Sequence, residues 1–174
     1  MIRAATASAV IAWLMFAAPA HAAEQDYDCD TGAEHYSELK QTLSGSRYEA
    51  SGTITPRRMY VGDRYMTSAR VSLQSADGRN FLSFRISGSA KAGDKTLMAT
   101  LFVQIDGEEK ETPLGPVDLM KPLAFSLQVD AKGSARLSLG EWQRDLMMPL
   151  GSVAIASATC STGEFQFNHL NLGG

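Results

Sequence analysis

The chain has 174 residues, of which 44% are hydrophobic and 20% charged, and its formal net charge at pH 7 is −3. This length suits one domain with a sizeable hydrophobic core. The acidic balance argues against binding to a nucleic-acid backbone, which requires a basic surface.

The N-terminal residues 1–22 have the layout of a secretory signal peptide. Arg3 precedes an apolar run from Ala4 to Ala18, and the small-residue site Ala20-His21-Ala22 follows. The apolar run is shorter than the roughly 20 residues needed to cross a bilayer. We therefore expect cleavage after Ala22, no membrane span after cleavage, and a periplasmic or secreted protein.

The two cysteines, Cys29 and Cys160, lie 131 positions apart, near opposite ends of the expected mature chain. In an oxidising compartment such a pair is expected to form a disulfide. A redox or metal-binding role usually needs a Cys-x-x-Cys motif or nearby histidine ligands, and neither is present. We predict a structural disulfide between them, and we expect no metal and no cofactor.

Residues 23–46 are expected to form an N-terminal segment with one short helix, from Gly32 to Leu43. Thr31 and Glu34 have the spacing of a helix capping box. Apolar residues then follow at i, i+3 and i+7, which is typical of an amphipathic helix: Tyr36, Leu39 and Leu43.

Residues 47–174 are expected to form a mostly β domain, an antiparallel β-sandwich. Apolar and polar residues alternate in short segments such as 82–86, 97–105 and 123–129, which is the pattern of strands with one face on a core. Gly-containing turn signals separate the segments, at 76–79, 105–108, 130–134 and 161–164. Many short strands with such turns predict two packed antiparallel sheets.

The C-terminal third resembles the closing strands of concanavalin A-like jelly rolls of the laminin G and glucanase type. The resemblance rests on a hairpin at Leu127–Leu139, a strand at Gly151–Ser157 and a last strand at Gly163–Leu170. It implies two curved sheets, with a ligand site on the concave face or at a loop rim. It implies no particular activity, because this fold carries lectins, adhesion modules, hydrolases and lyases.

Catalytic groups are not evident in the sequence. Glucanases of this superfamily carry Glu-x-Asp-x-x-Glu, and the nearest match places the neutral amide of Gln104 where the nucleophile is needed. Asp106-Gly107 in the same segment reads as a hairpin turn. Two histidines follow the expected signal peptide, and we expect His35 to lie on the solvent-exposed side of the helix. We expect His169 to be an inward or edge residue rather than a catalytic base.

Two kinds of surface are candidates for ligand binding. Aromatic and charged residues alternate around Arg58, Tyr60 and Tyr65, and Trp142 offers a further aromatic platform. Sugar-binding surfaces combine such platforms with polar groups for the hydroxyls. The alternative is that these aromatics cover the ends of the sandwich and the arginines protect an edge strand.

The second candidate is the polar face of the strands. We expect this face to be a ligand-binding groove if it is concave and a solvent-exposed surface without a site if it is convex. The residues assigned to it are Arg70, Ser83, Arg85, Thr100, Gln104 and Gln128.

These features favour an exported, non-catalytic module that binds a glycan or an envelope protein, or that serves as a structural subunit. The alternative is a carbohydrate-active hydrolase or lyase whose catalytic residues the sequence does not identify. Neither the ligand nor the oligomeric state follows from the sequence.

Overall fold

The computed structural model describes residues 24–62, 64–88 and 96–173, so the expected signal peptide lies outside the described residues. These ranges form strands joined by turns, and they contain no helix able to cross a membrane. The strands are β1 (Gln25–Ser44), β2 (Tyr48–Met59), β3 (Thr67–Ser75), β4 (Phe81–Gly88), β5 (Thr96–Ile105), β6 (Glu108–Asp118), β7 (Leu123–Val129), β8 (Ser134–Leu139), β9 (Trp142–Met147) and β10 (Val153–Gly173).

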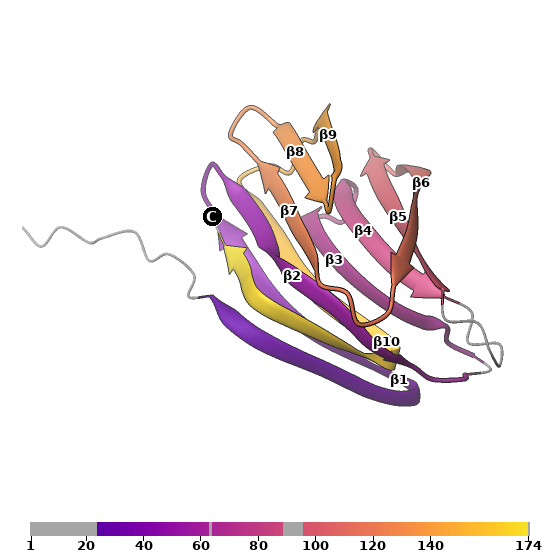
Figure 1. Ribbon diagram of the computed structural model, residues 1–174. Coiled ribbons are helices and arrows are strands. Elements are labelled where there is room, and N and C mark those ends of the chain that lie inside the picture. Colours follow the sequence, from indigo (N-terminus) through magenta and orange to yellow (C-terminus); the bar gives the residue numbers. More distant parts are fainter. Residues whose placement is uncertain (1–23, 63, 89–95, 174) are drawn as a thin grey trace, which may run out of the picture.

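All pairs are antiparallel, and the strand order is β6-β5-β4-β3-β10-β2-β7-β8-β9, with β1 paired to β10. The long strand β10 takes part in two layers, because residues 154–161 pair with β3 and residues 163–173 pair with β2. Strand β1 follows the same path beside it. Figure 1 shows β3, β4, β5 and β6 in one layer and β2, β7, β8 and β9 in the other.

We call the two layers sheet A and sheet B. Sheet A contains β3 to β6 with the first half of β10 and the second half of β1, and sheet B contains β2, β7, β8 and β9 with the other halves. The sheets pack through their alternating apolar side chains. Phe84 of β4 and Phe125 of β7, for example, have ring centroids 5.2 Å apart. The predicted antiparallel sandwich is therefore confirmed.

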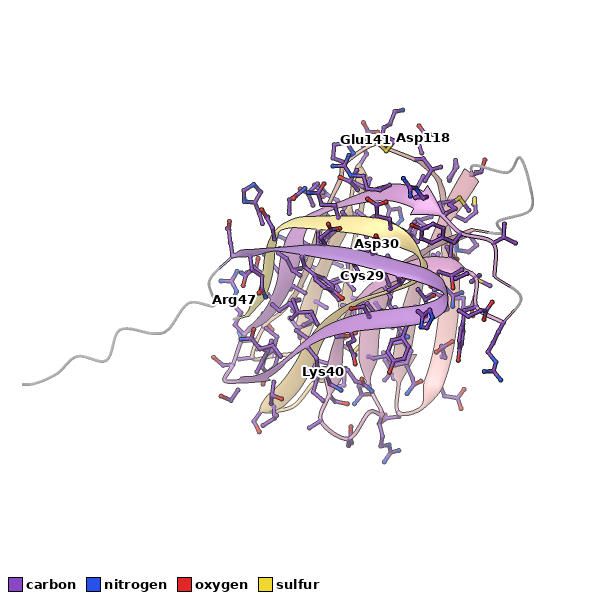
Figure 2. All side chains as sticks on the ribbon, turned by 90° about the horizontal axis from the view of Figure 1, so that it is seen from below. Cys29, Asp30, Lys40, Arg47, Asp118 and Glu141 are labelled. Atoms are coloured by element: carbon purple, nitrogen blue, oxygen red, sulfur yellow. A yellow bond between two sulfur atoms is a disulfide. The ribbon has the colours of Figure 1, made fainter. Side chains whose placement is uncertain are left out.

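The two sheets meet at a corner where β10 bends at Thr162 and Gly163. Thr162 adopts a positive φ of 49°, which is uncommon for a β-branched residue. Gly163 is required by space, because a Cβ at this position would lie 2.9 Å from the backbone oxygen of Arg58. Opposite this bend, the pairing of β1 with β10 shifts between Thr31 and Tyr36. Figure 2 looks onto β1 and β10 and shows Asp30 and Lys40 on the two arms of β1.

The predicted disulfide is confirmed, and it lies at this corner. Cys29 belongs to the arm of β1 in sheet B, whereas Cys160 belongs to the part of β10 in sheet A. Their Cα atoms are 6.2 Å apart, and both residues are buried. The bond therefore joins the two sheets as well as two distant parts of the chain.

The predicted helix from Gly32 to Leu43 is wrong, because these residues lie within β1. The two capping-box residues make long-range bonds instead. The Thr31 hydroxyl donates to the carbonyl of Gly163 at 3.0 Å, and the Glu34 carboxylate accepts from the backbone N–H groups of Arg64 and Tyr65. Tertiary contacts at the corner thus outweigh a local helix signal.

The predicted turns are confirmed in three places and corrected in a fourth; the turn at 76–79 joins β3 and β4. Asp106 and Gly107 form the β5–β6 hairpin turn with positive φ values of 53° and 91°, as a two-residue turn of this kind requires. The turn at 130–134 joins β7 and β8. The expected turn at 161–164 is instead the bend within β10, so the two last predicted strands are one strand shared by both sheets.

Candidate functional site

One outer face of the sandwich, on sheet A, combines arginines, aromatic rings and small polar residues. The register of β3, β4 and β5 places these side chains opposite one another, pointing away from the core. We call this surface the Arg–Phe face, and its residues are Arg70, Ser72, Phe81, Ser83, Arg85, Phe102 and Gln104.

The Arg–Phe face is largely covered although it lies outside the core. Ser83 is 0% exposed, Phe102 5% and Ser72 8%. The outer face of sheet B differs, since Ser126 is half-buried and Arg136 is exposed there. Long side chains that lie flat along a sheet cover their small neighbours in this way.

Arg70 and Arg85 are directly opposite each other on β3 and β4, and they share one aromatic ring. The guanidinium carbon of Arg85 lies 4.5 Å from the centroid of the Phe102 ring, and that of Arg70 lies 6.0 Å from it. Arg70 also lies 4.9 Å from the ring centroid of Phe81, and its Nε donates to the Ser83 hydroxyl at 3.0 Å. These contacts hold both guanidinium groups against the sheet.

Neither Arg70 nor Arg85 forms an ion pair with a carboxylate among the described residues, because no described carboxylate lies within 4.0 Å of either guanidinium group. The buried Nε of Arg85 has no hydrogen-bond partner. Burial lowers the pKa of Arg70, and the neighbouring charge of Arg85 lowers it further, whereas Glu109 acts in the opposite direction. The site therefore presents two positive charges without an ion-pair partner, and apart from the Nε of Arg70 the guanidinium N–H groups make no hydrogen bond to the described residues.

The edges of this face are polar. The Gln104 amide donates to the backbone carbonyls of Gly78 and Arg79, which fixes it beside the β3–β4 turn. Glu109 and Glu111 of the edge strand β6 are on the same side of the sheet, and both are exposed. On the far edge, Tyr36 of β1 shares this side of sheet A and is 72% exposed.

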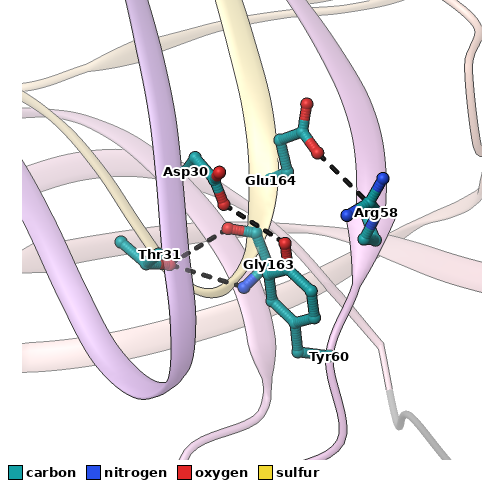
Figure 3. A network of polar contacts seen from close by, with 6 residues as sticks. All are labelled: Asp30, Thr31, Arg58, Tyr60, Gly163 and Glu164. Atoms are coloured by element: carbon teal, nitrogen blue, oxygen red, sulfur yellow. Dashed lines mark hydrogen bonds and ion pairs between the residues drawn. The ribbon is translucent and has the colours of Figure 1, made fainter.

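The predicted residues Arg58 and Tyr60 belong to a second cluster, on sheet B next to the corner (Figure 3). Arg58 forms an ion pair with Glu164 at 3.8 Å, and the Tyr60 hydroxyl donates to Asp30 at 3.3 Å. A cavity of about 340 Å³ opens here, lined by Asp28, Arg57, Arg58, Met120, Glu164 and Gln166. In this cluster Arg58 is paired with Glu164 and the Arg57 guanidinium donates to the Gln166 amide oxygen, whereas Arg70 and Arg85 have no ion-pair partner among the described residues.

The remaining predicted residues do not join either cluster. Tyr65 is 45% exposed in the loop after β2, with Arg64 6.0 Å from its ring. Gln128 lies on sheet B and donates to Glu49, so the expected polar face that combined it with Arg70 is wrong. Trp142 is partly buried and packs against the core from β9.

The sequence-based hypothesis overlooked both phenylalanines of the face. Phe81 and Phe102 occupy positions of β4 and β5 where the alternating pattern predicts polar residues. An aromatic residue at such a position could have indicated a binding surface on the outer face of the sheet. His169, expected to be inward or at an edge, lies at a bulge of β10 with an exposed side chain near Glu24. No cluster of His, Cys, Asp and Glu suited to a metal ion occurs in the described residues.

Comparisons with known proteins show the fold and no closer relationship. No family model and no curated protein matches the chain. Among solved structures, the carbohydrate-binding module CBM66 from Bacillus subtilis is 15% identical, with a TM-score of 0.50 over 82% of this chain and 83% of that chain. An alginate lyase from Pseudomonas aeruginosa is 13% identical, with a TM-score of 0.53 over 78% and 72%. A family 18 polysaccharide lyase is 8% identical, with a TM-score of 0.53 over 81% and 68%.

These structures share the concanavalin A-like jelly-roll fold, and the chain adopts it too. The resemblance inferred from the C-terminal third is thus confirmed at the level of fold.

Proposed function

We propose that this protein is an exported, non-catalytic module that binds a glycan on the Arg–Phe face of sheet A. The observation that carries the proposal is the pair Arg70 and Arg85, held against aromatic rings without a carboxylate partner among the described residues. Sugar rings suit such a surface, because their C–H faces pack on apolar groups while their hydroxyls accept hydrogen bonds from fixed donors.

An aromatic platform is present at a suitable spacing. Tyr36 lies two strands away from Arg70 and two residues further along the sheet. Strand spacing and rise per residue place the two Cα atoms about 12 Å apart, so a short oligosaccharide can contact both. The exposed ring of Tyr36 would then stack on one sugar unit while the arginines hold another.

The solved structures support the proposal without determining the ligand. One similar structure is a carbohydrate-binding module and two others are polysaccharide lyases. Export is supported by the N-terminal pattern and by the disulfide, since cytosolic thiols are usually kept reduced. An envelope protein is the alternative partner.

The test is a binding screen against immobilised neutral and acidic polysaccharides: cellulose, dextran, alginate, polygalacturonate and κ-carrageenan. We expect retention of the mature protein on at least one of them, with weaker retention of Tyr36→Ala. Met147→Ala is the matched control, because Met147 is 60% exposed on the edge strand of sheet B. Absence of binding to every glycan would contradict the proposed function.

One observation favours the enzyme as a second candidate. Glu109 and Glu111 are two carboxylates on one side of β6, next to the proposed binding face. A glycosidase needs two carboxylates that flank the bond that breaks, and residues two apart on one face of a strand have Cα atoms about 7 Å apart, which suits such a pair. Release of reducing sugars or unsaturated products by the wild type, but not by Glu109→Gln/Glu111→Gln, would establish the enzyme instead.

A further inference from the structure

We propose that the saccharide recognised by the Arg–Phe face carries an acidic group, a carboxylate or a sulfate ester, which is held between Arg70 and Arg85. This inference rests on the proposed glycan-binding function and specifies its ligand class.

The first argument is electrostatic. Like charges directly opposite each other on paired strands destabilise a sheet, and Arg70 and Arg85 occupy such a pair. Both side chains are half-buried, where water screens their repulsion less than at an open surface. An anion placed between them removes the repulsion and gains two attractive interactions, which a neutral sugar cannot do.

The second argument is the state of the donors. The Nε of Arg70 is occupied by Ser83, and this bond orients the rest of the guanidinium group. Arg85 contacts the ring of Phe102, and its buried Nε has no acceptor. A planar guanidinium group that is fixed in advance binds a carboxylate or sulfate through two parallel N–H donors, with little loss of side-chain freedom.

The third argument concerns the spacing of the negative charges on the ligand. Glu109 and Glu111 border the face on one side, and Glu38 lies on β1 on the other side. These carboxylates repel a ligand with dense charge, such as a nucleic acid, and the net charge of −3 acts in the same direction. A glycan with one acidic group per sugar unit can place that group between the arginines and its hydroxyls near the rim.

The experiment measures the affinity of the mature protein for acidic oligosaccharides and their neutral counterparts by calorimetry. The probes are oligogalacturonate and its carboxyl-reduced form, oligohyaluronate and its carboxyl-reduced form, and κ-carrageenan oligosaccharide and its desulfated form. We expect at least tenfold tighter binding to one acidic form than to its neutral counterpart, and weaker binding at higher salt. The uronate and sulfate arms show which acidic group is recognised.

The variants are Arg70→Gln, Arg85→Gln and Arg85→Lys, with Arg136→Gln as the matched control. Arg136 is an exposed arginine on sheet B, paired with Asp145 at 3.1 Å. Each Gln variant should lose at least tenfold in affinity, Arg85→Lys should retain part of it, and Arg136→Gln should bind like the wild type. Thermal unfolding of each variant checks that the fold is intact.

Three results separate the possible failures. If neutral forms bind as tightly as acidic ones and Tyr36→Ala weakens them, the acidic-ligand inference is wrong and the glycan-binding function stands. If acidic forms bind but the arginine variants bind them normally, the inference is also wrong. If no oligosaccharide binds, both the inference and the proposed function are wrong.

Discussion

The disulfide between Cys29 and Cys160 spans the corner of the sandwich, because Cys29 belongs to sheet B and Cys160 to sheet A. Their sequence separation of 131 means that the bond also closes most of the chain into one loop. In the chain-entropy model a loop of this size lowers the free energy of the folded state, relative to the unfolded state, by about 4–5 kcal/mol.

We predict that the double variant Cys29→Ala/Cys160→Ala loses about 2–5 kcal/mol of unfolding free energy, measured by urea denaturation. Because both cysteines are buried, with exposures of 0% and 2%, reduction of the wild type by dithiothreitol should proceed no faster than its unfolding. Rapid reduction without unfolding would show that the disulfide is accessible in the folded protein. A double variant as stable as the wild type would show that the disulfide contributes little to stability.

A second prediction compares two buried threonines at the corner. The Thr67 hydroxyl donates to the carbonyl of Thr162 at 2.7 Å, whereas the Oγ1 of Thr162 has no partner. Thr67→Val should therefore cost about 1–2 kcal/mol, because it removes a satisfied buried hydrogen bond. Thr162→Val should be neutral or stabilising, because it replaces an unsatisfied hydroxyl by a methyl group. Equal losses in the two variants, measured by chemical denaturation, would contradict this account of the corner.

A third prediction concerns alkaline pH. Tyr48 is 2% exposed, and its hydroxyl donates to the carbonyls of Gly45 and Gly151 at 3.0 and 2.9 Å. Burial raises the pKa of Tyr48, and burial is also the main cause of the raised pKa of Tyr27. Above the unfolded pKa of about 10, the unfolded chain loses these protons while the native protein keeps them.

The stability contributed by these tyrosines is therefore complete below about pH 10 and declines as the pH rises further. We expect the unfolding free energy to fall more steeply between about pH 9.5 and 11 for the wild type than for Tyr27→Phe/Tyr48→Phe. Because the variant also loses hydrogen bonds, the slopes are compared and not the absolute values. If the unfolding free energy fell equally steeply with pH in the wild type and in the double variant, the pH dependence would not come from Tyr27 and Tyr48.

A fourth prediction separates stability from binding on the Arg–Phe face. Arg85 is opposed by Arg70 and has no carboxylate within 4.0 Å in the part of the chain described. Arg85→Met keeps the apolar stem and removes the repulsion, so the unfolding free energy should stay the same or rise by up to about 1 kcal/mol. A loss of more than about 1 kcal/mol would indicate a structural role for this arginine.

The sandwich could be predicted because apolar and polar residues alternate along its strands with period two. The strand conformation of residues 25–44 could not be predicted in this way. The spacing of Leu39 and Leu43 suits a helix as well as a strand, since four residues is an even number and about one helical turn. In the structure both leucines point inward from β1 and Tyr36 points outward. Only contacts with β10 and the loop after β2, which are distant in sequence, decide between the two.

The candidate site was predicted in part, for a similar reason. Alternation placed Arg70, Arg85 and Gln104 on the outer side of their strands correctly. It could not say that β7 belongs to the other sheet, so Gln128 was joined to them wrongly. Nor does parity show that two arginines converge on Phe102, because this depends on how strands pair and on how long side chains fold along the sheet.

The central claim, that Arg70 and Arg85 together hold an acidic sugar, is tested most directly by NMR of the arginine Nε–H groups during titration with the tightest acidic oligosaccharide. The account predicts that the signals of Arg70 and Arg85 move together and saturate with the calorimetric affinity, while that of Arg136 stays in place. Movement of the Arg57 and Arg58 signals, with Arg70 and Arg85 unchanged, would place the ligand in the cavity on sheet B and contradict the claim.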